Sequence, residues 1–239
     1  MRILAGTSGF AFKEWKGPFY PEDLKDKDFL SYYASKFPTV EINNTFYQLP
    51  KTAILESWAA QVPANFSFAI KASRRITHFA RLKPESAETV HYMLTTLSAL
   101  GPRLGPILFQ LPPNLKREME RLAEFLKVLP PGKRYAMEFR HESWFGDDLF
   151  ALLRKHNVAL VTIEQEDFAS PLVSTAEWGY ARLHRMDYKP EDIAAWAKKI
   201  TSQGWNEAYV VFKHDHTPEA GSGPLAVDGF LKACSAQAV

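Results

Sequence analysis

The stretch VEINNTFYQLP, residues 40–50, decides the fold prediction. Its first residues alternate, so Val40 and Ile42 would lie on one face of a β-strand and Glu41 and Asn43 on the other. The polar residues come at the carboxyl end of this strand, and two aromatic residues and a proline follow at once. A carboxylate and amides at the end of an otherwise apolar strand are typical of the site-bearing end of a βα unit.

Strand-like runs recur along the rest of the chain, with helix-like segments between them. The predicted strands are Ile3–Thr7, Thr39–Asn43, Phe66–Lys71, Pro106–Leu111, Tyr135–Arg140, Ala159–Glu164, Tyr180–His184 and Ala208–Lys213. The predicted helices are Asp26–Phe37, Thr52–Gln61, Glu85–Leu100, Lys116–Leu129, Asp147–His156, Pro190–Gln203 and Pro224–Ala236. Residues 167–178, between the sixth and seventh strands, hold at most a short helix.

Eight βα units in 239 residues predict an α/β fold, a single TIM-type (β/α)8 barrel. No linker rich in Pro, Gly or Ser divides the chain, so one domain is expected over residues 1–239. A doubly wound sheet is disfavoured, because GTSGF (6–10) lacks the spacing of a dinucleotide-binding fingerprint and no helix follows it.

Alternation within each strand predicts which residues face the barrel interior. In chain order, the expected inward residues toward the carboxyl ends are Ala5 and Thr7, Glu41 and Asn43, Ala69 and Lys71, Leu108 and Gln110, Glu138 and Arg140, Thr162 and Glu164, Arg182 and His184, and Val211 and Lys213. The intervening residues are mostly apolar and would face the helices. Barrel enzymes carry their chemistry at the carboxyl ends of the strands, which places a candidate site there.

The charges in this inward set favour an anionic ligand. Lys71, Arg140, Arg182 and Lys213 outnumber the carboxylates Glu41, Glu138 and Glu164. Guanidinium groups bind phosphate and carboxylate in a bidentate manner, so the expected partner is a small molecule that carries one of these groups.

Eight motifs at the strand ends resemble one known family. They are GTSGF (6–10), WKGPFYP (15–21), EINNTFYQLP (41–50), FSFAIKASRRITH (66–78), ILFQLPP (107–113), MEFRHESW (137–144), YARLH (180–184) and VVFKHD (210–215). Together they are similar to the domain-of-unknown-function 72 family, the YecE-like proteins, over nearly the whole chain. The resemblance implies a TIM-type barrel and leaves the reaction open. Many relatives carry glycine where this chain has Arg185.

The leading hypothesis is an enzyme that uses carboxylates as general acid and base on a polar, anionic small molecule. Glu138 beside Arg140 is the expected base. Glu41, beside neutral amides and rings, is the expected acid with a raised pKa, and His184 is the reserve for either role. The expected substrate-binding residues are Asn43, Lys71, Gln110, Arg140, Trp144, Arg182 and Lys213. A competing interpretation makes Glu138 part of a structural salt bridge with Arg140 or Arg182.

Two other function classes stay open. A metal-dependent isomerase or phosphodiesterase would use Glu41, Glu138, Glu164 and His184 as ligands, although the nearby cations oppose a bare metal ion. A non-catalytic barrel would bind a phosphorylated ligand or nucleic acid. No metal or cofactor is expected.

The composition limits which partners and which cellular location we expect. The formal net charge of +2 gives no support for a nucleic-acid or membrane partner, and Cys234 is the single cysteine. No apolar run is long enough to span a bilayer and no export signal is visible, so a cytoplasmic location is expected. The oligomeric state is not predicted.

Overall fold

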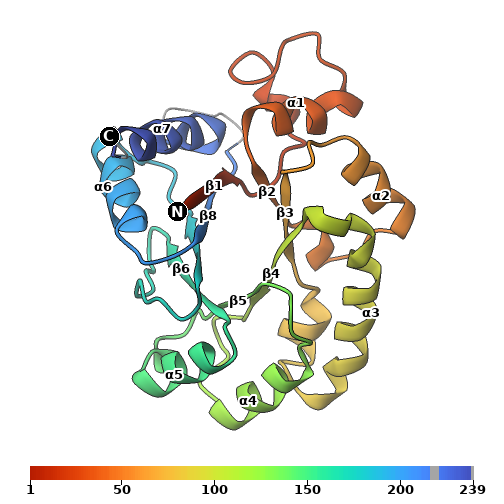
Figure 1. Ribbon diagram of the computed structural model, residues 1–239, viewed down its shortest axis with the longest axis vertical. Coiled ribbons are helices and arrows are strands. Elements are labelled where there is room, and N and C mark those ends of the chain that lie inside the picture. Colours follow the sequence, from red (N-terminus) through yellow and green to blue (C-terminus); the bar gives the residue numbers. More distant parts are fainter. Residues whose placement is uncertain (216–220, 238–239) are drawn as a thin grey trace.

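A parallel β-barrel forms the centre of the protein, and helices surround it (Figure 1). The computed structural model describes residues 1–215 and 221–237. The strands are β1 Arg2–Thr7, β2 Thr39–Ile42, β3 Ser67–Lys71, β4 Leu104–Gln110, β5 Tyr135–Glu138, β6 Ala159–Glu164, β7 Trp178–Leu183 and β8 Glu207–Phe212. All pair in parallel, in the order β1-β8-β7-β6-β5-β4-β3-β2. The predicted TIM-type α/β fold is confirmed.

Helices follow most of the strands and pack on the outside of the barrel. They are α1 Phe29–Lys36, α2 Thr52–Ala60, α3 Ala87–Leu97, α4 Met119–Val128, α5 Asp147–Lys155, α6 Pro190–Thr201 and α7 Gly223–Ala236. Helix α4 begins three residues later than predicted, after a segment in which the Arg117 amide donates to Ser143 Oγ at 3.0 Å. Between β6 and β7 the chain forms no helix.

The barrel is nearly closed, and its weakest junction lies between β1 and β2. No ladder joins these two strands in the described residues, and they meet through the isolated parallel bridge between Ser8 and Glu41. Gly6 allows this approach, because a Cβ atom there would clash with the Thr39 carbonyl. The junction therefore depends on one small residue.

Two separate apolar clusters identify the faces of the strands. The cluster inside the barrel consists of Leu4, Ala69, Leu108, Ala136, Ala159, Val161, Trp178, Tyr180, Tyr209 and Val211. The outer cluster contains the alternate strand residues, such as Ala5, Val40, Phe109 and Leu160, packed against helices. Inside the barrel, Ser67 Oγ and Tyr209 OH lie 2.9 Å apart, which links β3 to β8.

The predicted inward face is confirmed for six strands and wrong for β1 and β6. On β6 the inward residues include Val161, whereas Thr162 donates to the Pro171 carbonyl and Glu164 accepts from the Trp196 indole on α6 at 2.9 Å. On β1 the inward residue is Leu4, and Thr7 Oγ1 lies 2.9 Å from Tyr33 OH of α1. In both strands, loops and helices supply hydrogen-bond partners for polar groups on the outer face. The prediction assigned these polar residues to the interior because it used the pattern of polarity alone.

No helix in residues 1–215 or 221–237 is long and apolar enough to cross a membrane.

Candidate active site

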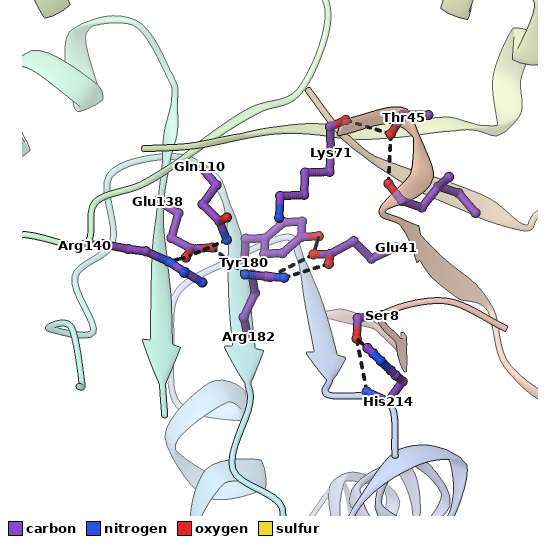
Figure 2. Close-up of polar contacts among 11 residues, drawn as sticks. Ser8, Glu41, Thr45, Lys71, Gln110, Glu138, Arg140, Tyr180, Arg182 and His214 are labelled. Carbon is purple, nitrogen blue, oxygen red and sulfur yellow. Dashed lines mark hydrogen bonds and ion pairs between the residues drawn. The ribbon is translucent and has the colours of Figure 1, made fainter. Parts of the chain in front are cut away.

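Three charged side chains from three strands meet inside the barrel at the carboxyl ends (Figure 2). The Arg182 guanidinium on β7 binds Glu41 of β2 through two bonds, Nε–Oε2 at 2.9 Å and Nη2–Oε1 at 2.8 Å. Its Nη1 donates to Glu138 Oε2 of β5 at 2.7 Å. Arg182 is 3% exposed and both carboxylates are 0% exposed. The interior therefore holds one cation between two anions.

Neighbouring side chains satisfy the remaining carboxylate oxygens. Glu138 Oε1 accepts from Arg140 Nε at 2.6 Å and from Gln110 Nε2 at 3.0 Å. Glu41 Oε2 also accepts from Tyr180 OH at 2.8 Å. We call these six residues, Glu41, Gln110, Glu138, Arg140, Tyr180 and Arg182, the arginine–carboxylate network.

The network keeps Glu138 ionised. Burial acts to raise the pKa of this carboxyl, but the charges of Arg182 and Arg140 and the bonds that it accepts outweigh burial and lower the pKa to about 2. Burial likewise acts to lower the pKa of Arg182, yet the two carboxylates raise it above its ordinary value. Both groups are charged at neutral pH, as the salt-bridge interpretation predicts.

A cavity of about 620 Å³ lies at this end of the barrel. Its lining comprises Ser8, Gly9, Phe10, Ala11, Phe12, Ile42, Asn43, Asn44, Tyr47, Trp58, Lys71, Arg182, His184, Lys213 and His214. Of the predicted site residues, Asn43, Lys71, Arg182, His184 and Lys213 line the cavity. Glu41, Gln110, Glu138 and Arg140 belong to the network and do not line it.

Lys71, at the end of β3, is the most unusual cation of the cavity wall. Its Nζ lies 4.4 Å from the centre of the Phe46 ring, and within the described residues it has no hydrogen bond or ion pair. Burial lowers its pKa to about 8; Arg182 acts in the same direction, and Glu41 opposes it. About a tenth of the Lys71 side chains are therefore neutral amines at pH 7.

His184 is buried in the cavity wall as a neutral imidazole. Burial, followed by the positive charge of Arg182, holds its pKa well below the ordinary range. Its Nε2 is buried and has no hydrogen-bond partner among the described residues. A ring nitrogen in this state is unusual, since buried polar atoms normally have a partner.

Several polar residues of the site were missed by the strand pattern, among them Ser8, Asn44 and His214 of the cavity lining and Tyr180 of the network. Ser8 follows β1, and its Oγ lies 3.2 Å from His214 Nδ1 and accepts from the His214 amide at 3.1 Å. The prediction missed Ser8 because it assigned the wrong face of β1 to the interior. Tyr180 precedes Arg182 by two residues on the same face of β7, so extending the alternation by one step finds it.

Three sequence expectations need correction. Trp144 does not reach the cavity: it is buried under Phe139 and its indole donates to the Leu115 carbonyl at 2.8 Å. Glu164 faces α6 instead of the interior. The environment predicted for Glu41 is also wrong, because a guanidinium occupies both of its oxygens rather than neutral amides and rings.

The arrangement offers little to a metal ion. In the described part of the chain, no group of three His, Cys, Asp or Glu side chains is placed to hold one. Of the four ligands that the metal hypothesis requires, Glu41 and Glu138 are engaged by Arg182 and Glu164 lies outside the barrel.

A family model described as "Protein of unknown function DUF72" matches residues 4–237. The chain belongs to the DUF72 family. The E. coli K12 protein YecE (UPF0759) is 38% identical over 118 residues, which cover 49% of this chain and 43% of YecE. The matched stretch thus spans less than half of that curated relative.

Solved structures agree with the barrel. A crystal structure of a DUF72 family protein from Thermotoga maritima superposes with a TM-score of 0.77 at 26% identity, and covers 98% of this chain and 100% of that one. D-psicose 3-epimerase, solved in the presence of D-fructose, superposes with a TM-score of 0.52 at 11% identity over 95% of this chain and 89% of the epimerase. The second likeness concerns the fold alone.

Proposed function

We propose that this DUF72 protein is an enzyme that acts on a small anionic molecule in the cavity at the carboxyl ends of its strands. One observation carries the proposal, namely that Arg182 and Arg140 form ion pairs with both interior carboxylates, those of Glu41 and Glu138. Lys71 therefore faces the cavity without an ion pair to any carboxylate of the described residues. Lys213 also lines the cavity, 4.0 Å from the half-exposed Glu166. A phosphate or carboxylate would balance this positive charge.

The roles differ from a simple pair of acid–base carboxylates. The contacts of Glu41 and Glu138 support a positioning role, in which they fix Arg182 beneath the ligand. Lys71 becomes the reactive group, because a pKa of about 8 lies near the operating pH that proton transfer and nucleophilic attack both require. His184 and Asn43 supply neutral hydrogen-bonding groups for the uncharged part of the ligand.

Titration of inorganic phosphate against thermal unfolding tests the anion site. A ligand of the native state stabilises by RT ln(1 + [L]/Kd), about 2.7 kcal/mol at a hundred times Kd. We expect a rise in Tm for the wild type beyond that given by potassium chloride at equal ionic strength, and a smaller rise for Lys71→Met and Lys213→Met. Lys127→Met, which alters an exposed lysine of α4, is the matched control.

Two results would count against the site: no phosphate-specific shift, or an undiminished shift in both cavity variants. A non-catalytic binding barrel is the second candidate. The unpartnered Nε2 of His184 fits a ligand-binding site of either kind and does not distinguish binding from catalysis. Turnover of a stabilising anion by the wild type, lost in Lys71→Met at an anion concentration that saturates the weaker binding of this variant, separates the enzyme from that alternative.

A further inference from the structure

The backbone of Lys71 is fixed at the edge of the cavity. Its backbone pairs with Leu108 in the β3–β4 ladder, and its carbonyl accepts from Thr45 Oγ1 at 2.7 Å. The same hydroxyl also donates to the Ile42 carbonyl, which ties the loop after β2 to the end of β3. In Figure 2 the Lys71 amine points toward the arginine–carboxylate network. The contact that is seen for the amine itself is with the Phe46 ring, whose centre lies 4.4 Å from Nζ.

The network has no excess negative charge to balance Lys71, because Glu41 and Glu138 are matched by Arg182 and Arg140. Arg182 takes both oxygens of Glu41 and one of Glu138, while Arg140 and Gln110 take the other. A desolvated ammonium beside a guanidinium loses its proton more readily than one beside a free carboxylate. A neutral lysine amine in a cavity is a nucleophile for carbonyl carbon.

We propose that Lys71 forms an imine with the carbonyl carbon of a small anionic oxo compound, either a 2-oxo acid or a phosphorylated aldehyde or ketone. This inference rests on the proposed function and specifies its substrate class. Lys213, which lines the same cavity, is the cation that would face the anionic group, above the paired guanidinium of Arg182. The cavity of about 620 Å³ accommodates such a molecule, since small-molecule sites commonly measure roughly 300–1,000 Å³.

The step balances without an oxidant or reductant. The lone pair of Lys71 Nζ attacks the carbonyl carbon and forms the C–N bond, while the π pair of the carbonyl moves to its oxygen. One proton then passes from the nitrogen to that oxygen and gives a neutral carbinolamine. A second proton, taken from solvent, allows the C–O bond to break and water to leave as the nitrogen lone pair forms the C=N bond of the iminium. His184, a neutral imidazole, and the amides Asn43 and Asn44 belong to the lining of the same cavity.

Reductive trapping tests the imine. The full chain is incubated with pyruvate or dihydroxyacetone phosphate and sodium borohydride, which delivers hydride to the imine carbon and fixes the adduct. Intact-mass and peptide analysis then locate it. We expect one reduced adduct per chain, on Lys71, for at least one probe. At pH 7 the neutral fraction of Lys71 exceeds that of an ordinary lysine by roughly two orders of magnitude, so surface labelling stays minor.

The controls isolate each element of the inference. Lactate, which carries a hydroxyl group where pyruvate carries its ketone, should give no adduct. Lys71→Met should lose the adduct, whereas Lys51→Met, a change of an exposed lysine in the neighbouring loop, should keep it. Inorganic phosphate should compete with dihydroxyacetone phosphate and slow its labelling.

Failure of the imine and failure of the anion site give different results. If either probe raises Tm but neither is trapped on Lys71, the inference is overturned and the anion site stands. Labelling that is spread over surface lysines and unchanged in Lys71→Met also overturns it. If neither probe nor phosphate raises Tm, the proposed function falls and the inference falls with it.

Discussion

Arg182 of β7 binds Glu41 of β2 across the barrel in a bidentate manner, with hydrogen bonds of 2.9 and 2.8 Å. These strands are not neighbours in the sheet. The pair therefore acts as a cross-barrel staple, in which Arg182 also lines the cavity. The bond from Arg182 to Glu138 extends the staple to a third strand. A planar guanidinium is suited to this role, because its donors lie in a fixed fork.

Removal of Arg182 should destabilise the fold strongly. Arg182→Met leaves Glu41 and Glu138 buried, with Glu41 lacking a cationic partner, and the loss of one partner of a buried pair costs about 3–5 kcal/mol. Urea unfolding at pH 7 measures the change. Lys127→Ala, which breaks an exposed pair with Glu124, is the control and should cost less than about 1 kcal/mol. A cost for Arg182→Met no larger than this control would contradict the staple.

The pKa of Glu138 predicts an acid-sensitive component of stability. This pKa falls from 4.5 to about 2 on folding, so the contribution is fully present above pH 4.5 and is lost as the pH falls toward 2. Its size is on the order of 3 kcal/mol. Unfolding free energies from pH 7 to pH 2 should fall less steeply below pH 4.5 in Glu138→Gln than in the wild type. Parallel curves for the two proteins would disprove the assignment.

Lys71 should destabilise the folded protein at neutral pH. Its pKa falls from 10.5 to about 8 on folding, so between these pH values the unfolded chain binds more protons than the folded chain. The contribution of Lys71 to the free energy of unfolding therefore rises with pH across this window. Lys71→Met should raise stability at pH 7, by about 1–3 kcal/mol, and the gain should shrink toward pH 10.5. Urea unfolding at pH 7 and pH 10 provides the comparison. A destabilised variant at pH 7 would show that the amine is a structural partner.

Closure of the barrel should depend on Gly6. A methyl group at this position would strike the Thr39 carbonyl, so Gly6→Ala must push β1 and β2 apart. We expect a loss of about 1–3 kcal/mol, typical of overpacking, together with faster amide hydrogen exchange around the Ser8–Glu41 bridge. Gly204→Ala, at a site with nothing within 4 Å of the added atom, is the matched control. Equal effects of the two changes would rule out a special role for Gly6.

The sequence by itself determined the barrel and most of its interior. Alternation in the strands placed Glu41, Lys71, Glu138, Arg182 and Lys213 on the inward face, because a strand has a period of two residues. The same rule failed on β1 and β6. Their outward polar groups are satisfied by Tyr33 and Trp196 on helices and by Pro171 in the loop after β6, and the polarity of the strands carries no signal of such partners.

Only the tertiary structure decided how the charges pair. Glu41 and Arg182 are separated by 141 positions, and nothing near either residue shows that the guanidinium would take both oxygens of this carboxylate. Once that pair forms, Glu41 and Glu138 are committed and Lys71 is left without a carboxylate in the described residues. The charge balance inside the barrel depends on all eight strands together. The choice of Lys71 as the proposed reactive group therefore rests on distances and burial, which composition and periodicity do not contain.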